Sequence, residues 1–225
     1  MKLPLAEEIA KALCENAQQE LKKEQTILKN VHPKHAKSLK KLRKAFTQAE
    51  VAHAYCNQDE KKKRKAKIKK LNKFTDPCGS LNDKIRQNVS FAVVAQKAHS
   101  NFLLLKNKHV EMKGCSQPEL IRRMEESKKW FVKKSTKTKI SDNTFHMIRF
   151  YLRQLMYIHK IIAKKKLVND EQNLEEHTEC WKKLEDVSEN MGEMHDDLID
   201  GKRNRCTLTD KMWKVIQWYS HLNYS

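Results

Sequence analysis

The residues of this sequence with the clearest chemical character form a basic run at positions 61–70. The run reads Lys-Lys-Lys-Arg-Lys-Ala-Lys-Ile-Lys-Lys and contains no acid, glycine or proline. Cations at this density attract polyanions, which indicates binding to nucleic acid, nuclear localisation or contact with an anionic membrane; a merely solvated helix face is the alternative. No aromatic residue interleaves with the run, which disfavours recognition of single strands by base stacking. The predicted basic patch consists of Lys61, Lys62, Lys63, Arg64, Lys65, Lys67, Lys69 and Lys70.

The residue combinations that could support catalysis or bind a metal are incomplete. Glu50 and His53 have the Glu-x-x-His spacing of carboxylate-bridged metal bundles, but no second copy exists to complete such a site. The six cysteines form no Cys-x-x-Cys pair, and no Gly-x-Ser-x-Gly or glycine-rich phosphate loop is present. We therefore expect a protein that is not an enzyme, with no catalytic residue, metal or cofactor. The cysteines are expected to be small buried thiols, and the helical histidines to lie at the surface or the edge of the core.

The composition limits the fold that must position these residues. Only four glycines and four prolines occur among 225 residues, which disfavours sheet folds because sheets need turns. The 47 Lys and Arg against 28 Asp and Glu give a formal net charge of +19. No run of about 18 apolar residues is present, so no membrane span is expected. Glu7 and Glu8 stand where a signal peptide has an apolar run, and we predict a cytoplasmic protein, with membrane-associated or nuclear locations as alternatives.

Apolar residues recur at helical spacing along most of the chain. This pattern predicts an all-α fold, a bundle of six to seven amphipathic helices with a basic N-terminal helical extension. The breaker Thr75–Ser80 divides the chain into residues 1–76, an N-terminal helical hairpin with a basic arm, and residues 80–225, a helical bundle domain. Asp142 is the predicted N-cap of the central helix. The expected helices cover residues 3–30, 34–73, 81–112, 117–134, 143–166 and 171–198, with a last helix after Thr207 or Thr209.

Four stretches in the C-terminal two-thirds resemble the tumour-necrosis-factor-alpha-induced protein 8 family. Residues 91–97 read Phe-Ala-Val-Val-Ala-Gln-Lys and are similar to the opening string of that family's first helix. Residues 118–128 are similar to a Glu-apolar-x-x-x-apolar-x-x-Arg/Ser helix of that family, and residues 145–155 resemble its Ile-x-x-apolar-Ile central helix. Residues 167–174, followed by Trp-Lys-Lys-Leu at 181–184, are similar to its hairpin and following helix. The resemblance covers about residues 90–185, and the N-terminal 80 residues lie outside it.

Members of that family are helical proteins that bind lipid, so the resemblance implies a bundle around an apolar tunnel and a phosphoinositide-like ligand. Lys97, a matched position, is then a headgroup candidate. We add Arg86, Arg122 and Arg123, because a guanidinium matches phosphate geometry. The apolar pocket is expected to be lined by Phe91, Val94, Phe102, Leu152, Leu155 and Ile158, for which a closed core is the alternative.

Three functions are compatible with these features. The leading hypothesis is a non-enzymatic regulator or adaptor that binds an anionic lipid, a membrane surface or a protein partner. The alternative is a nucleic-acid-binding protein that uses the basic helix at 34–74. The third is a helical membrane scaffold, which the breakers along the chain disfavour because they leave only short helices.

Overall fold

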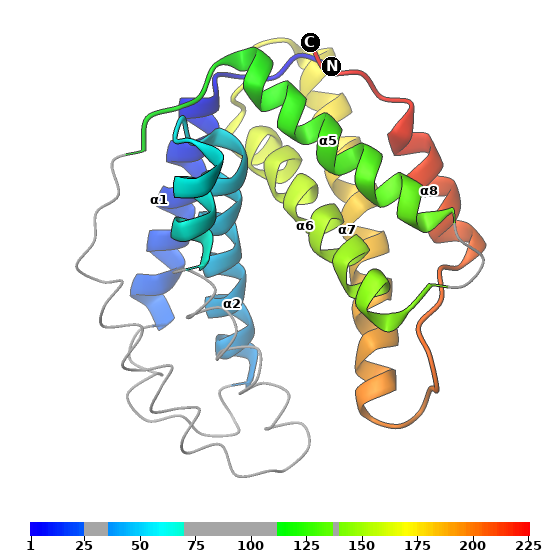
Figure 1. The fold of residues 1–225 in the computed structure, drawn as a ribbon. Helices are drawn as coiled ribbons and strands as arrows, with labels where there is room; N and C mark the ends of the chain where they lie inside the picture. The colour runs from blue at the N-terminus through cyan, green and yellow to red at the C-terminus, as the bar shows by residue number, and fades with distance from the viewer. Residues whose placement is uncertain (25–35, 70–111, 137–139) are drawn as a thin grey trace. The chain divides into compact units, whose positions relative to one another are not determined.

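The structure is a computed structural model that describes residues 1–24, 36–69, 112–136 and 140–225 (Figure 1). These residues belong to two compact units, one made of Met1–Leu5 and Ser116–Ser225 and the other of Ala6–Cys115. The regular elements among the described residues are helices, and no strand occurs there, so the predicted all-α class is confirmed. No described helix combines the length and the apolar character needed to cross a bilayer.

Four helices build the unit of residues 116–225: α5 (Gln117–Ser135), α6 (Asp142–Lys165), α7 (Glu171–Ile199) and α8 (Asp210–Ser220). Their bounds confirm the periodicity-based helices within two residues. Helix α6 packs against α5 and α7, while α8 packs against α5 and α7 (Figure 1). Because α6 is apolar on several sides, it supplies much of this core. Fully buried side chains of the unit include Leu120, Met124, Phe131, Phe145, Ile148, Leu152, Leu155, Ile158, Leu184 and Ile216.

The ends of these helices follow capping chemistry, with one departure from expectation. The predicted cap Asp142 is wrong: Ser141 is the N-cap of α6, and its side chain accepts from the backbone N–H of Thr144. Asp142 is instead the first helical residue, where a carboxylate is also favourable because of the helix dipole. Thr209 caps α8, as one of the two expected threonines. Gly201 follows α7 with a φ of 71°, a conformation that suits glycine.

The first residues of the chain pack within this same unit. The backbone N–H of Leu3 donates to Ser225 at 3.1 Å, and that of Ser225 donates to Met1 at 3.0 Å. The backbone N–H of Lys2 donates to the Asn173 side chain on α7 at 2.9 Å. Residues 1–5 therefore join the segment after α8 to α7, and Figure 1 shows the two chain ends side by side.

The unit of residues 6–115 contains α1 (Ala6–Glu24), α2 (Ala36–Val51) and the π-helical turn η3 (Ala52–Cys56). Helix α1 packs against both α2 and η3. Asn16 donates across the α1–α2 contact to the Gln48 side chain at 2.5 Å. The buried apolar side chains that hold these elements together include Ile9, Leu13, Ala17, Leu42, Phe46, Val51 and Tyr55.

The single helix predicted for residues 34–73 is wrong, because the chain leaves the helix at Asn57 and resumes it over residues 61–69. Asn57 is extended, with φ −73° and ψ 133°, and pairs antiparallel with Gly114. The N–H of Cys115 donates to Cys56 at 2.7 Å, and that of Gln58 donates to Lys113 at 3.0 Å. These partners lie more than fifty residues away in sequence, so a long-range pairing interrupts a locally helical pattern.

Gly114 lies against the first turn of α1. A Cβ atom on Gly114 would stand 2.6 Å from the backbone nitrogen of Glu7 and 2.9 Å from its Cα. Real Cβ atoms do not approach backbone so closely, so this contact requires glycine. The segment 113–115 is thereby fitted between η3 and α1 in the same unit.

Several sequence predictions fall on residues that the structure does not describe. These are the break at residues 77–79 and the helix at 81–112 up to residue 111. The same holds for the site candidates Lys70, Arg86, Phe91, Val94, Lys97 and Phe102.

Candidate functional site

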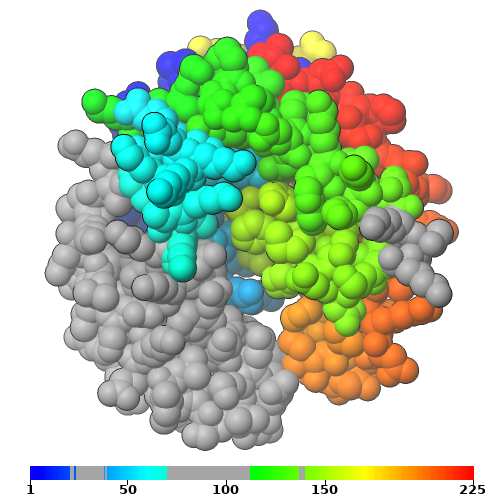
Figure 2. Space-filling view, viewed as in Figure 1, coloured from blue at the N-terminus to red at the C-terminus, as the bar shows by residue number. Residues whose placement is uncertain are grey.

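The basic helix, residues 61–69, is the most strongly charged short element that the structure describes. It contains no acid, and most of its lysines are exposed to solvent. The segment appears in cyan in Figure 2, where its side chains form part of the molecular surface. Five of the seven described residues of the predicted basic patch are therefore exposed, while Arg64 and Lys67 are half-buried. The exposed lysines are Lys61, Lys62, Lys63, Lys65 and Lys69.

Two basic residues of this helix face the turn that precedes it. Lys67 places its Nζ 2.6 Å from Asp59 Oδ2, and Arg64 donates from Nη1 to the Asp59 backbone oxygen at 2.7 Å. The hydrogen bond from Lys67 is the main cause that lowers the pKa of Asp59. Arg64 and Lys67 thus attach the helix to its own N-terminal turn, while the five exposed lysines point elsewhere.

The same turn is held on its other side by a neutral histidine. Asn57 donates from its side-chain nitrogen to His53 Nδ1 at 3.1 Å and accepts from the N–H of Asp59 at 2.7 Å. Burial, and next the positive charge of Lys67, lower the pKa of His53 to about 4. An imidazole that accepts at Nδ1 must be uncharged there. Among the described residues no cluster of three or more side chains is arranged to hold a metal ion, Glu50 and His53 included.

The predicted headgroup arginines of α5 are already bound to carboxylates. Arg122 donates to Glu119 from Nε and Nη2, each at 2.8 Å, and also contacts Glu126. Arg123, with only 6% of its side chain exposed, donates from Nε to Glu119 at 2.6 Å. The hydrogen bond from Arg122 is the largest cause that lowers the pKa of Glu119 to about 2. A phosphate at these guanidinium groups would have to replace Glu119.

The described members of the predicted apolar pocket are core residues. Leu152, Leu155 and Ile158 on α6 have no accessible surface. They lie among the side chains of the unit of residues 116–225 and pack as a closed core does.

A basic aromatic surface on α6 and α7 was not predicted from the sequence. The ring of Trp181 lies 4.9 Å from Lys160 Nζ and 5.3 Å from Lys164 Nζ. Its indole N–H donates to Glu185 at 2.7 Å, and Glu185 also binds Lys160. The pair Lys160–Trp181 spans two helices, which explains why no local pattern signals it. Lys165 and Lys166 extend this exposed positive surface.

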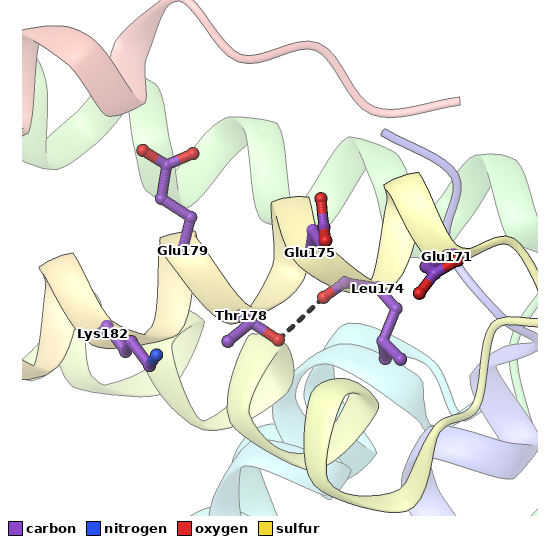
Figure 3. Close-up of a pocket in the computed structure, with 6 residues that line it drawn as sticks. All are labelled: Glu171, Leu174, Glu175, Thr178, Glu179 and Lys182. Carbon is purple, nitrogen blue, oxygen red and sulfur yellow. Dashed lines mark hydrogen bonds between the residues drawn. The ribbon is translucent and has the colours of Figure 1, made fainter.

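The outward face of α7 contains a hollow of about 390 Å³ (Figure 3). Three of its six lining side chains are glutamates, and the Thr178 hydroxyl donates to the backbone oxygen of Leu174 at 2.8 Å. This charge does not suit an anionic headgroup. The lining side chains are Glu171, Leu174, Glu175, Thr178, Glu179 and Lys182.

A buried histidine–tyrosine cluster lies where α6, α7 and α8 meet residues 1–5. Its members are His159, His177, Tyr219 and Tyr224. His159 Nδ1 lies 2.9 Å from His177 Nδ1, and His159 Nε2 lies 2.9 Å from the hydroxyl of Tyr219. The Tyr224 hydroxyl is 3.3 Å from the same Nε2 and contacts that of Tyr219. His177 Nε2 lies 2.8 Å from the backbone oxygen of Lys2.

The partners of this cluster fix the position of each proton. A carbonyl only accepts, so His177 carries its proton on Nε2 and accepts at Nδ1 when it is neutral. His159 must then donate from Nδ1, which leaves its Nε2 to accept from a tyrosine hydroxyl. Burial lowers the pKa of His177 to about 4 and that of His159 well below its usual value. Both histidines, expected at the surface or the core edge, have no accessible surface.

Comparison of the chain with protein-family models, with curated proteins and with solved structures finds no match.

Proposed function

We propose that the protein is a non-enzymatic regulator or adaptor that binds an anionic membrane surface through the basic helix. The observation that carries the proposal is the set of five exposed lysines on a helix without acids. Of the two acids just before it, Asp59 is already paired with Lys67, and Glu60 is exposed next to Lys61. The helix therefore presents a net positive charge to an external polyanion.

The size of this attraction is sufficient for reversible membrane binding. A lysine near an anionic leaflet contributes about 1 kcal/mol, so five favour binding by about 5 kcal/mol at low salt. This attraction acts over about one Debye length from the membrane surface. Salt shortens that length, so the binding affinity should fall as the salt concentration rises. The anionic leaflet of a cell faces the cytoplasm, which agrees with the predicted location.

The family resemblance supports the finer proposal of a phosphoinositide-like lipid. Under it, Arg122 and Arg123 exchange Glu119 for a headgroup phosphate; the other two headgroup candidates, Lys97 and Arg86, lie outside the described residues. Bidentate contacts from arginine suit a phosphate as well as a carboxylate. The proposal does not include a tunnel for lipid tails, because Leu152, Leu155 and Ile158 are enclosed by protein.

The test is cosedimentation of the full chain with phosphatidylcholine vesicles that contain a phosphatidylinositol bisphosphate. A variant with Lys61, Lys62, Lys63, Lys65 and Lys69 changed to Gln is expected to lose at least about tenfold in binding. A matched variant of equal charge changes five exposed lysines of the other unit to Gln: Lys129, Lys133, Lys165, Lys182 and Lys214. This second variant should bind more strongly than the first.

Two outcomes would contradict the proposal: absence of the wild-type chain from the pellet at low salt, or equal losses in both variants. Vesicles that contain phosphatidylserine at the same surface charge distinguish general binding to an anionic membrane from a preference for phosphoinositide. Equal binding to both lipids would retain the membrane surface and remove the phosphoinositide preference.

A second candidate function, binding of duplex nucleic acid, is favoured by the spacing of three lysines. Lys61, Lys65 and Lys69 are four residues apart, so they share one side of the helix at intervals of about 6 Å. Such a stripe can follow the phosphates of one strand, and each phosphate contact steepens the salt dependence of affinity. An electrophoretic shift of a short duplex that is lost in the five-lysine variant supports this candidate. No shift at low salt would remove it.

A further inference from the structure

Cys56 and Cys115 lie opposite one another in the short antiparallel pairing of residues 56–58 with 113–115. The bridge joins Asn57 to Gly114, and the flanking hydrogen bonds run from Cys115 to Cys56 and from Gln58 to Lys113. Adding the residue numbers of each pair gives the same sum, which fixes the register. Cys56 is therefore the direct neighbour of Cys115 across the pair, and both are thiols in the structure.

The backbone hydrogen bond between the two cysteines sets their separation. The N–H of Cys115 lies 2.7 Å from the oxygen of Cys56. Cys56 is the last residue of η3, and this single bond keeps the two Cα atoms within about 6.6 Å of each other, which is inside the range of natural disulfides. The Cys115 thiol also donates to the oxygen of Tyr55 at 3.3 Å, and that carbonyl is bonded to the nitrogen of Cys56. The Cys115 side chain is therefore directed to the chain at Cys56.

We propose that Cys56 and Cys115 form a redox-active dithiol that closes to a disulfide in reaction with a small-molecule disulfide such as oxidised glutathione. This modification site goes beyond the proposed membrane function and does not depend on it. Its test requires no anionic partner.

The reaction consists of two thiol–disulfide exchanges. The half-buried Cys115, as thiolate, attacks one sulfur of the small disulfide, and the other sulfur leaves as a thiolate that takes up a proton. Cys56, also as thiolate, then attacks the Cys115 sulfur and releases the second small thiol. Two protein thiols are oxidised to one disulfide, and the small disulfide is reduced to two thiols.

The accessible surface decides which thiol reacts first. Cys115 is partly exposed, whereas Cys56 is buried and can reach only a sulfur already attached to Cys115. At two other described cysteines, burial disfavours the reactive thiolate. Burial raises the pKa of Cys14 to about 11 and that of Cys180 to about 12, so little thiolate forms at either.

The disulfide would close the chain segment that contains the basic helix. Residues 61–69 lie between Cys56 and Cys115 in sequence, and both ends of the segment would then be held covalently at η3. A closed segment has fewer unfolded conformations than an open one. Oxidation is therefore expected to stabilise the unit of residues 6–115 and leave the other unit unchanged.

The experiment is equilibration of the full chain in glutathione buffers of increasing oxidation, followed by alkylation, digestion and mass spectrometry. We expect a peptide pair joined through Cys56 and Cys115, with both thiols lost together from the alkylated pool. In Cys56→Ser, Cys115 should stop at the mixed disulfide with glutathione. In Cys115→Ser, Cys56 should stay alkylatable after denaturation. Cys14→Ser is the matched control in the same unit and should form the joined pair as the wild type does.

Two results would overturn the proposal. One is full alkylation of both cysteines at every glutathione ratio in the wild-type chain. The other is linkage of Cys115 to a different cysteine, for example Cys78. Both results are read from the wild type, so neither depends on whether a variant folds.

Discussion

His159 and His177 face one another through their Nδ1 atoms, 2.9 Å apart, within the unit of residues 116–225. Only one proton fits between these two nitrogens. Protonating His177 at Nδ1 would turn two donors toward one another, and protonating His159 at Nε2 would force the tyrosine hydroxyls from donors into acceptors. The cluster is therefore satisfied when both rings are neutral, and it joins α6, α7 and α8 to residues 1–5.

The first prediction is a loss of stability in this unit as the pH falls. Unfolded histidine titrates near 6.5, whereas burial lowers the pKa of folded His177 to about 4, so the unfolded chain binds more protons between these values. The free energy of unfolding should fall by up to about 1.4 kcal/mol per pH unit for each ring as the pH drops below about 6.5. Urea unfolding followed by tryptophan fluorescence measures it.

The charges around the pair reinforce this direction. Lys128 from α5 and the amino group of Met1, which lies 3.8 Å from Glu176, both disfavour a second positive charge. His221→Gln, at an exposed position of the same unit, is the control and should keep the same pH dependence. A free energy of unfolding that is constant from pH 7 to pH 5 would contradict the conclusion that His159 and His177 are neutral in the folded unit.

The second prediction concerns the two tyrosine hydroxyls near His159. Either Tyr219→Phe or Tyr224→Phe leaves one hydroxyl able to donate to His159 Nε2, so each single change should cost about 1 kcal/mol or less. The double variant leaves a buried acceptor unsatisfied, and its cost should exceed the sum by about 1–2 kcal/mol. A double-mutant cycle of urea unfolding measures the coupling. Strict additivity would show that the hydroxyls do not share this nitrogen.

The third prediction follows from the N-cap of α6. Ser141→Ala removes the acceptor for the N–H of Thr144 and should lower the free energy of unfolding by about 1 kcal/mol. Asp142→Asn keeps the helix start and loses only a favourable charge, so it should cost less than about 0.5 kcal/mol. The reverse order in thermal or urea unfolding would assign the cap to Asp142 instead.

The fourth prediction compares two glycines that meet equally close neighbours. In Gly114→Ala the new Cβ would stand 2.6 Å from the Glu7 backbone, which cannot turn away, so a cost of about 1–3 kcal/mol is expected. In Gly192→Ala the neighbour at 2.6 Å is the end of the Arg149 side chain, which can rotate. Far-UV circular dichroism during urea unfolding should show the larger loss for Gly114→Ala. Equal losses would mean that segment 113–115 moves freely away from α1.

The fifth prediction tests how Asp59 limits the charge of the basic helix. Asp59→Asn removes the ionic partner of Lys67 and adds one positive charge to this surface. Binding to anionic vesicles should strengthen, and its salt dependence should steepen by about one further released ion. Asp186→Asn, which removes the partner of Lys211 in the other unit, is the matched control. An equal gain in both variants would assign the effect to net charge alone.

The helices of residues 116–225 could be predicted because their signals are local. Turn and cap residues such as Asp170 and Thr209 stand at the ends of strongly periodic apolar runs. The break at Asn57 could not be predicted, because its cause is a pairing with Gly114. The choice between Ser141 and Asp142 as cap depends on backbone angles, and both residue types are good caps.

The candidate sites divide in the same way. The basic run at 61–69 is visible in the sequence because its charges are contiguous. The cluster around His159 is not visible in the sequence, because His177 lies 18 residues and Tyr219 60 residues further along the chain. One signal was present: His159 follows Tyr157 and Ile158 and precedes Ile161 and Ile162, so a polar ring occupies an apolar stretch that is buried. Such a histidine needs a buried hydrogen-bond partner, and only the fold shows which residue that partner is.

All four tryptophans of the chain belong to one unit and stand at its surface. Trp130, Trp181, Trp213 and Trp218 are each half-buried, and ammonium groups lie over three of their rings. The unit of residues 6–115 contains no tryptophan among its residues. Tryptophan fluorescence therefore reports on the unit of residues 116–225 and not on the unit of residues 6–115. Fluorescence and circular dichroism recorded on a single sample can thus reveal whether the two halves melt together or one after the other.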